Sequence, residues 1–486
     1  MSNKQKIRKI KYAPPPPELP VYGRVDPKEC SFFGRTNYEA ALEEKKFIFG
    51  IKRKDRRRHM YIIGKSGVGK SKLLELLIRQ DIAYGKGVCL IDPHGDLIDS
   101  ILDFIPEERI DDVALIDPAD TEFPVSFNPL LNVGPELKHQ VTQGLIEVLE
   151  KQFGANWTPR LEHVFRFTCL ALLDYPEATM RGMIFMLTDR NYRQKVVDYI
   201  EDDMVKRFWA IEFADWSEKF DTEAITPLVN KLSQFLSNPL LRNIFGQKEN
   251  KIDLEKIMNE QKILLINLAK GKLGEENSSF FGSMFITKIY QAGMARASMP
   301  EEERLDFYLY VDEFHNLVTS TFENLFAESR KYGLCITVAH QYLDQLLPSV
   351  LATVLGNTGT IVIFRVGGND AGRLTAEMTP IFSAEDMINL GVREFYIKMT
   401  IDGETFDPFS AETLSVLSPP HPSYKREIIE RSREKYAISI EEAKRKMTEE
   451  EEKLRREAKK AEKKREKRMK ENGKKKSQKD ETEPLV

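Results

Sequence analysis

The chain of 486 residues carries 73 basic and 76 acidic side chains, so its formal net charge is only −3. This length is too great for one ordinary core and predicts two or three domains, or one domain with a large insertion. The charge balance excludes a polycationic protein, so any contact with nucleic acid must come from a local cluster of charge.

The cysteines and the chain start indicate the compartment. Cys30, Cys89, Cys169 and Cys335 form no C-x-x-C pair, which favours buried free thiols over zinc or disulfides. The opening MSNKQKIRKIKY lacks the apolar stretch of a signal peptide, and no run of about 18 apolar residues occurs. We therefore expect a soluble cytoplasmic protein that reaches a membrane only through a partner or its charged tail.

The first 46 residues read as a proline-rich basic arm. Four consecutive prolines at 14–17 favour an extended polyproline segment, which is more often a spacer than a recognition peptide. Residues 47–51 then predict a strand. The following run KRKDRRRH at 52–59 lies on a turn, where it is either a solvated charge run or a contact to nucleic acid or phosphate.

The most informative stretch is GKSGVGKS, which follows the β-type run Met60–Ile63 and precedes a helical pattern. This context makes G-x-x-x-x-G-K-[ST] a phosphate-binding loop, because glycines let the backbone wrap closely around an anion. We expect Lys70 to reach the β- and γ-phosphates and the Ser71 hydroxyl to hold Mg²⁺. The predicted nucleotide-binding residues are Gly64, Lys65, Ser66, Gly67, Val68, Gly69, Lys70 and Ser71.

Short apolar runs alternate with helical segments on both sides of a long helical region. This alternation predicts an α/β fold with a mostly parallel central sheet, whose functional groups gather at the carboxyl ends of the strands. An Asp402-Gly403 turn predicts a terminal hairpin. The expected strands are 87–92, 113–116, 263–268, 307–311, 335–341 and 360–365. We therefore divide the core into 47–125 and 259–418.

Residues 126–258 lose the β-type runs and predict an inserted all-α domain. Its aromatic side chains, at helical spacing, form either core or a stacking platform: Trp157, Phe165, Phe167, Trp209, Phe213 and Trp216. Residues 419–486 form a charged tail, helical to about Lys470 and disordered from Asn472. Apolar residues recur seven apart from Ile440, but the complementary seam is charged, which favours a solvated single helix over a coiled coil.

Two acids after the 307–311 strand supply the chemistry that a phosphate loop needs. We expect Asp312 to support the metal and Glu313 to orient and polarise the attacking water. The alternative is a pair of exposed acids that cap the next helix. Gln341, at the end of the following strand, is either a sensor of the γ-phosphate or a surface glutamine.

Arg330 is the candidate arginine finger. It lies at a helix C-terminus, where a cation is favourable in any case, but its sharper role is to complete the nucleotide site of a neighbouring subunit. Arg365 and Arg373 compete for that role.

These motifs in this order resemble the TraG/TraD-type coupling ATPases of conjugation and type IV secretion, within the FtsK/HerA superfamily. The resemblance covers roughly 47–415 and includes GKSGVGKS, LIDPHGDL, FNPL at 127–130, YVDEF and SRKYGLCITVAHQ. It implies a RecA-like motor core that uses ATP and Mg²⁺, a homo-hexamer with nucleotide at subunit interfaces, and DNA driven through a central pore. By position, Arg330 matches the family's trans finger and Gln341 its strand-end glutamine.

The resemblance also implies partners and a place of action. The helical insertion is expected to recognise the relaxase, the relaxosome or other secretion cargo. Coupling proteins of this type commonly begin with transmembrane helices, where this sequence has the proline-rich arm. We therefore expect a peripheral position at the inner face of the cell membrane, with membrane contact through partners.

The predicted function is an ATP-hydrolysing DNA translocase that acts as a coupling protein. One alternative keeps the motor and makes it a HerA-like or FtsK-like pump in DNA repair or segregation. Another is an ATP-dependent factor that couples protein cargo to a secretion channel and binds no DNA. The strandedness of the DNA and the direction of travel stay open at this point.

Overall fold

Contacts within the chain divide the computed structural model into two units. The first contains Met1–Asp120, Glu147–Gly154 and Lys251–Ala437, and the second contains Thr121–Ile146, Ala155–Asn250 and Ile438–Val486. The structure describes residues 10–38, 46–131, 133–213 and 225–480. The basic start of the arm, Trp216 and the last six residues of the tail lie outside these ranges.

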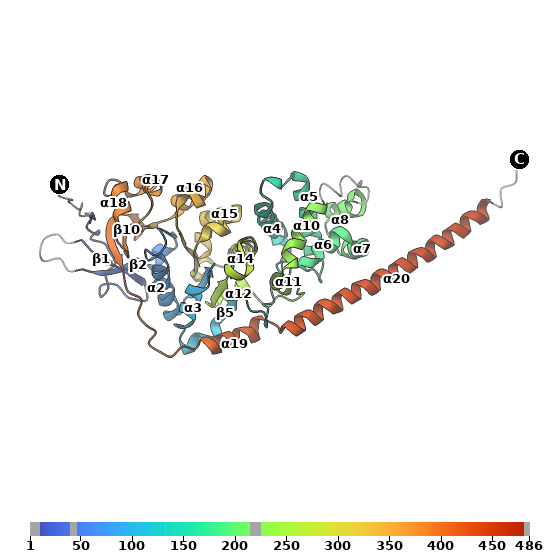
Figure 1. The fold of residues 1–486 in the computed structure, drawn as a ribbon, viewed down its shortest axis with the longest axis horizontal. Helices are drawn as coiled ribbons and strands as arrows, with labels where there is room; N and C mark the ends of the chain where they lie inside the picture. Colours follow the sequence, from blue (N-terminus) through green and yellow to red (C-terminus); the bar gives the residue numbers. More distant parts are fainter. Residues whose placement is uncertain (1–9, 39–45, 132, 214–224, 481–486) are drawn as a thin grey trace, which may run out of the picture. The chain divides into compact units, whose positions relative to one another are not determined.

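One mixed sheet organises the first unit (Figure 1). Its strands follow the order β2-β1-β12-β10-β9-β3-β8-β7-β4-β6-β5, with β11 paired to β10. The run from β9 to β5 pairs in parallel, whereas the run from β2 to β9 pairs antiparallel. The strands are β1 Cys30–Thr36, β2 Ile48–Lys52, β3 Met60–Ile63, β4 Gly87–Asp92, β5 Val113–Ile116, β6 Ile263–Asn267, β7 Phe307–Val311, β8 Leu334–His340, β9 Thr360–Ile363, β10 Glu394–Ile401, β11 Glu404–Thr405 and β12 Phe409–Thr413.

Helices cover this sheet. Alternate residues of a strand face opposite sides, so Met60 and Ile62 of β3 join one hydrophobic core with the apolar residues of α2 and α3. Tyr61 points to the other side, where Phe314 lies near it. The helices of this unit are α1 Arg53–Arg56, α2 Lys70–Ala83, α3 Asp96–Leu102, α12 Leu254–Asn259, α13 Lys270–Leu273, α14 Glu275–Ala295, α15 Ser320–Glu328, α16 Pro348–Asn357, α17 Gly368–Met378, α18 Ala384–Asn389 and α19 Lys425–Tyr436.

The predicted α/β class with a mostly parallel sheet is confirmed, and each strand expected from the sequence lies within about two residues of an observed one. The described part of the first 46 residues does not form the expected spacer. Within them β1 pairs with β12 and β2, and the backbone oxygen of Ala13 accepts a hydrogen bond from Ser410 N at 3.3 Å. The extended conformation that proline favours is also one that lies along a sheet, so this segment packs on the core.

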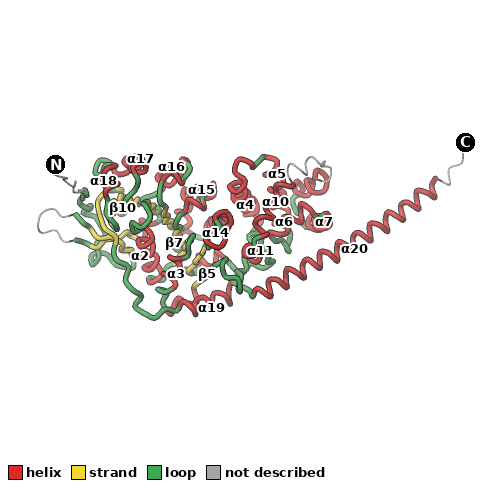
Figure 2. The backbone as a smooth tube through the Cα atoms, viewed as in Figure 1, coloured by secondary structure: helices red, strands yellow, loops and turns green. Residues whose placement is uncertain are grey.

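The second unit consists of helices and loops within the described residues, as Figure 2 shows. Phe165, Trp209 and Phe213 are buried there, which agrees with the core alternative for the aromatic set. The helices are α4 Lys138–Phe153, whose last turns belong to the first unit, α5 Pro159–Leu173, α6 Met180–Thr188, α7 Arg190–Val197, α8 Asp203–Arg207, the π-helical η4 Phe208–Glu212, α10 Thr226–Ser237, α11 Pro239–Phe245 and α20 Ile440–Asp480.

The start of α20 is packed, which corrects the expectation of a fully solvated helix. Ala443 and Met447 are buried with Ile438, and the guanidinium of Arg181 pairs with the carboxylate of Glu450 at 3.7 Å. These contacts cover one face of the first turns of α20. The helix also continues to Asp480, past Asn472, where disorder was expected.

Three expectations about the whole chain concern cysteines, metal clusters and membrane spans. All four cysteines are buried free thiols, as predicted. The described residues contain no group of three or more His, Cys, Asp or Glu side chains arranged for a metal ion. Nor does any helix in the described ranges combine the length and the apolar character needed to cross a bilayer.

Candidate nucleotide-binding and hydrolysis site

The glycine-rich loop joins β3 to α2 at the carboxyl edge of the sheet. Gly67 and Gly69 have φ values of 75° and 123°, which residues with a Cβ rarely adopt. Gly64 has no room for a side chain, since a Cβ there would lie 2.6 Å from the Cβ of Phe364. Lys65 N donates to Arg365 O at 2.9 Å, so the loop is fixed against the end of β9.

Lys70, the first residue of α2, turns its side chain back across the loop. Its Nζ donates to Gly64 O at 2.6 Å and to Lys65 O at 3.1 Å. Burial lowers the pKa of Lys70, while the carboxylates of Glu313 and Asp312 act in the opposite direction. A buried cation beside the N-terminus of α2 is an arrangement suited to phosphate oxygens.

Ser71 and Asp312 lie side by side. Ser71 Oγ donates to Asp312 Oδ2 at 3.3 Å. Burial, followed by the nearby charges of Glu313 and Asp92, raises the pKa of Asp312 to about 6, against the effect of Lys70. A hydroxyl and a carboxylate oxygen are the hard donors that Mg²⁺ takes from a protein when it also binds phosphates. The pair therefore fits the predicted metal.

Glu313, the second residue after the end of β7, is held in a left-handed conformation with φ of 46° and ψ of 45°. The side chains of Asp312 and Glu313 are buried, unlike the exposed acids of the alternative reading. Gln341 Nε2 donates to Glu313 Oε1 at 2.8 Å, so this glutamine is tied to the site rather than lying on a bare surface. The carboxyl ends of β7 and β8 thus bring the two predicted residues into contact.

Arg330 lies away from its own loop. It is exposed in η10 Ser329–Tyr332, at the amino end of β8. A seven-residue strand at about 3.3 Å per residue puts roughly 20 Å between that end and the site. Arg373 pairs with Asp344 at 2.8 Å on the surface, and Arg365 follows β9 beside its own loop.

The basic run at 52–59 is not a uniformly solvated loop: two of its arginines are buried in ion pairs, whereas Lys54 is exposed. Arg53 and Arg56 are buried, and the guanidinium of each pairs with the carboxylate of Asp81 on α2. Lys52 and Lys54 both pair with Asp402. These cations fasten α1 to the amino edge of the sheet.

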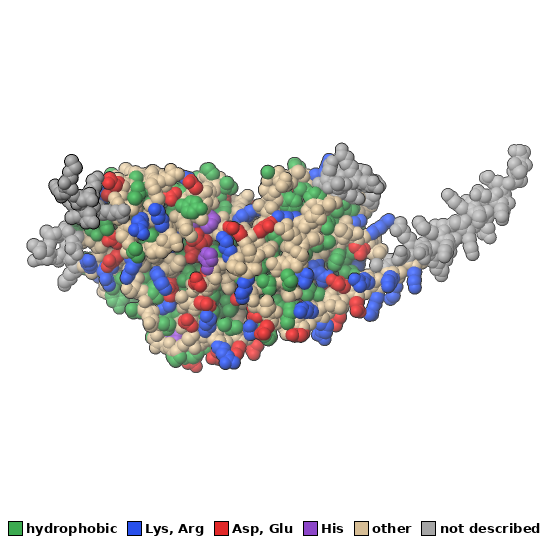
Figure 3. All heavy atoms as spheres, viewed as in Figure 1, with side chains coloured by type: hydrophobic (Ala, Val, Ile, Leu, Met, Phe, Trp, Pro, Cys, Tyr) green, Lys and Arg blue, Asp and Glu red, His purple; other side chains and the backbone are tan. Residues whose placement is uncertain are grey.

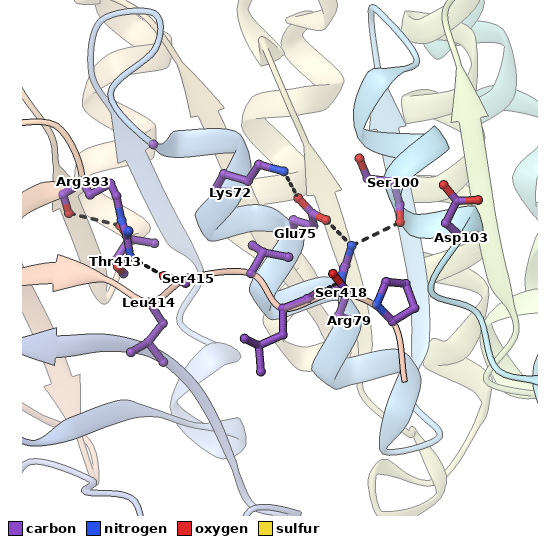
Figure 4. A pocket seen from close by; sticks show the side chains of 14 residues that line it. Lys72, Glu75, Arg79, Ser100, Asp103, Arg393, Thr413, Leu414, Ser415 and Ser418 are labelled. Carbon is purple, nitrogen blue, oxygen red and sulfur yellow. Dashed lines mark hydrogen bonds and ion pairs between the residues drawn. The ribbon is translucent and has the colours of Figure 1, made fainter. Parts of the chain in front are cut away.

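A cavity of about 470 Å³ begins beside Gly69 and follows the outer side of α2 (Figure 4). Arg393 closes the end near the loop, where its guanidinium donates to Thr413 O at 2.7 Å. Arg79 donates to Leu417 O at 2.7 Å and so holds the segment after β12 over the helix. The lining residues are Gly69, Lys72, Glu75, Arg79, Ser100, Asp103, Arg393 and 413–419.

Two residues that the sequence did not single out, His315 and Gln345, also lie at this site. His315 Nδ1 is 3.5 Å from Glu313 Oε2, and Gln345 contacts the backbone of Gln341. The signal available in the sequence was their position, two residues after Glu313 and four after Gln341. Nothing in the residue types alone joins these two segments.

A family model described as the type IV secretion-system coupling protein DNA-binding domain matches residues 48–379, which is more than half of the chain. The chain belongs to this family. The predicted membership of the TraG/TraD-type coupling proteins is confirmed. Because the chain also carries the phosphate-binding loop, this coupling protein is a P-loop ATPase.

Solved structures share the fold of this coupling protein. The bacterial conjugative coupling protein TrwBdeltaN70, in its unbound monoclinic form, gives a TM-score of 0.57 at 14% identity over 81% of this chain and 98% of that chain. TrwB in complex with ADP and Mg²⁺ gives 0.54 at 15% identity over 77% and 89%. VirB4 of Thermoanaerobacter pseudethanolicus gives 0.52 at 14% identity over 76% and 94%. A comparison with curated protein sequences finds no match.

Proposed function

We propose that this coupling protein hydrolyses ATP with Mg²⁺ and uses the energy to move DNA in conjugation or type IV secretion. The observation that carries the proposal is the convergence of Lys70, the Ser71–Asp312 pair and the Glu313–Gln341 pair at the end of the glycine-rich loop. The family match and the complexes of TrwB with an ATP analogue and with ADP and Mg²⁺ support it.

Each residue has a task in hydrolysis. Lys70 and the loop amides bind the β- and γ-phosphates, while Ser71 and Asp312 hold the metal. A Mg²⁺ ion held there would supply positive charge to the phosphate oxygens. Glu313 orients a water in line with the γ-phosphate and accepts its proton. Gln341, bonded to Glu313 Oε1, is within reach of both the general base and the phosphate side of the site.

The cavity beside Gly69 accommodates the ribose and the base. A nucleotide whose γ-phosphate lies near Glu313 extends along the loop toward the start of α2. The end of the cavity near Arg393 and Ser415 lies there, and Arg393 N donates to Val68 O of the loop at 2.9 Å. The base therefore contacts the segment after β12.

The active form is a homo-hexameric ring in which Arg330 completes the site of the neighbouring subunit. Arg330 is exposed at the edge of the sheet opposite its own loop, which suits a residue that acts across an interface. Arg373 already has the carboxylate of Asp344 as a partner, and Arg365 lies beside its own loop, so both are weaker candidates.

DNA and secretion components are the proposed partners, and the coupling-family match favours them over a repair pump or a protein-only factor. On the face drawn in Figure 3, basic and acidic side chains of the described residues are interspersed. A ring that grips the DNA backbone needs only a few cations from each subunit. The helical unit is the proposed site for relaxase or relaxosome, and these partners bring the protein to the inner face of the membrane.

The test is the ATPase rate against protein concentration, with single-stranded DNA, double-stranded DNA or none, for the wild type and Arg330→Ala. The proposal expects a rate that rises with concentration and DNA and collapses in the variant. Lys331→Ala is the matched control, since Lys331 is an exposed neighbour paired only loosely with Glu328 at 3.7 Å. A rate per subunit that ignores concentration and DNA, with a normal variant, would oppose the ring and favour the protein-cargo alternative.

A further inference from the structure

A chain of contacts through three residues, Gln341, Gln345 and His315, leads from one oxygen of the Glu313 carboxylate to the other. Gln341 Nε2 donates to Glu313 Oε1 at 2.8 Å, and Gln341 N donates to Gln345 Oε1 at 3.3 Å. Gln345 Nε2 lies 3.0 Å from His315 Nε2. His315 Nδ1 lies 3.5 Å from Glu313 Oε2.

Hydrogen bonds fix the orientation of the Gln345 amide. Its Oε1 accepts from two backbone amides, Gln341 N at 3.3 Å and Tyr342 N at 3.2 Å. A backbone N–H can only donate, so the atom that faces both must be the oxygen. The nitrogen of Gln345 therefore faces His315, and it acts there as a donor.

This orientation selects one tautomer of His315. Because Gln345 Nε2 donates, His315 Nε2 must accept and carries no proton. The neutral ring then has its proton on Nδ1. Burial, with the cations of Lys270 and Lys151 nearby, lowers the pKa of His315 against the opposing effect of Glu313 and Glu275, which also favours the neutral ring.

The Nδ1 atom of His315 lies 3.5 Å from the second oxygen of Glu313. Glu313 Oε2 and His315 Nδ1 are both buried, and neither makes a hydrogen bond within the described residues at the present geometry. Their 3.5 Å separation is longer than a good hydrogen bond. Contacts at hydrolytic sites commonly tighten when the substrate is bound.

We propose that His315, held as its Nδ1–H tautomer by Gln345, is a positioning residue for the general base Glu313. The inference rests on the proposed ATPase function. When Gln341 turns its amide toward the γ-phosphate, it releases Glu313 Oε1 to accept the proton of the attacking water. His315 meanwhile keeps Oε2 in position, so that the carboxylate does not swing away with the glutamine.

Two substitutions of His315 separate its two nitrogens. His315→Asn keeps a donor near the position of Nδ1 and loses the contact with Gln345. His315→Gln keeps a polar group near Nε2 and loses the donor to Glu313. The proposal expects His315→Gln and His315→Ala to lower the single-turnover hydrolysis rate about ten- to a hundredfold, the loss typical of removing an orienting partner. His315→Asn keeps most of the rate.

Binding and coupling measurements exclude a merely structural role. The dissociation constant of a fluorescent ATP analogue should stay within about twofold of wild type, because the substitutions leave the phosphate-binding loop unchanged. The melting temperature should stay within a few degrees of wild type. In a Glu313→Gln background, His315→Gln should lower the rate no further, since it acts through Glu313. If His315→Ala fails to fold, the Asn and Gln variants still decide.

Each outcome has one meaning. Equal losses in the Asn and Gln variants, or a further loss in the Glu313→Gln background, overturn the role of His315. A normal rate in His315→Gln, with Glu313→Gln inactive, overturns it while the ATPase function stands. If Glu313→Gln keeps the full rate, Glu313 is not the general base and the role of His315 fails with it, while the ATPase function stands. If the wild type hydrolyses no ATP, the proposed function itself fails.

Discussion

Asp312 and Glu313 are neighbours in sequence, yet their surroundings give the two carboxylates different tasks. Asp312 lies against the Ser71 hydroxyl and near Asp92, in a cluster of negative charge that a cation relieves. Glu313 turns away through its left-handed backbone toward Gln341 and His315. In the proposed mechanism, two adjacent residues that face different partners therefore take metal binding and water activation.

The buried histidines of the described residues are His59 and His340, and the titration of His59 affects acid stability. His59 Nδ1 accepts from Ile336 N at 3.2 Å, and burial lowers the pKa of His59 to about 4. In the unfolded chain the pKa is near 6.5, so between pH 6.5 and 4 the unfolded state binds the extra proton. The stability from neutral His59 is therefore fully present above pH 6.5 and is lost as the pH falls toward 4.

We predict that this contribution reaches about 2 kcal/mol at pH 5, so His59→Asn, which keeps an acceptor for Ile336 N and tolerates the φ of 63°, should lose about that much less stability on acidification than wild type. The buried His340, whose pKa burial lowers to about 3, contributes equally in both proteins. The measurement is urea unfolding at pH 7.5 and pH 5, with the exposed His94→Asn as control. An equal acid loss in wild type and His59→Asn would contradict the assignment.

At the scale of elements, a buried charge cluster fastens α1 and α2 to β7. The carboxylate of Asp81 receives Arg53, Arg56 and the hydroxyl of Tyr310, which donates to Oδ2 at 2.6 Å. The guanidinium of Arg56 also stacks over the ring of Tyr308, 4.1 Å from its centroid. Asp81 is fully buried, so the two cations depend on it for compensation.

We predict that Asp81→Asn destabilises the protein by about 3–5 kcal/mol, because it leaves two guanidiniums buried without their counter-charge. Lys54→Ala, which removes only an exposed partner of Asp402, should leave stability nearly unchanged. Denaturant unfolding of both variants checks this. A small effect of Asp81→Asn would mean that water compensates the arginines.

The segment after β12 is the element expected to meet the nucleotide base. Ser415 lines the cavity near Arg393, whereas Ser418 lines it farther along the same exposed segment. We predict that Ser415→Trp fills the near end and raises KM for ATP several-fold with little change in kcat, since it removes uniform binding. Ser418→Trp is the matched control, and an equal rise in KM there would argue that the base binds elsewhere.

Local pattern predicted the elements whose signal is contained within a few residues. The loop at 64–71 and the strand that ends at Asp312 are of this kind, because glycine spacing and a buried apolar run are visible in one window. Contacts between residues in different segments of the chain could not be predicted from local pattern. Examples are Arg56 with Asp81, His315 with Gln345, and the start of α20 with Arg181. The basic run at 52–59 was ambiguous for this reason, since its buried partner carries no mark in the sequence.

At the scale of the whole molecule, the site is incomplete within one chain if Arg330 serves a neighbour. The loop and the finger lie at opposite edges of the same sheet, so one subunit presents its loop where the next presents Arg330. Such a head-to-tail interface closes into a ring when the rotation between subunits allows it. Hydrolysis in one subunit then depends on the position of the next, which is what a motor requires.

Mixing two inactive variants tests this arrangement directly. Lys70→Ala subunits lack the phosphate contact but keep the finger, whereas Arg330→Ala subunits lack the finger but keep the loop. In a random equal mixture about a quarter of the interfaces pair an intact loop with an intact finger, so we predict recovery of roughly that fraction of the wild-type rate. A mixture as inactive as either variant alone would mean that Arg330 does not act across the interface, and Arg365 would be the next residue to test in the same way.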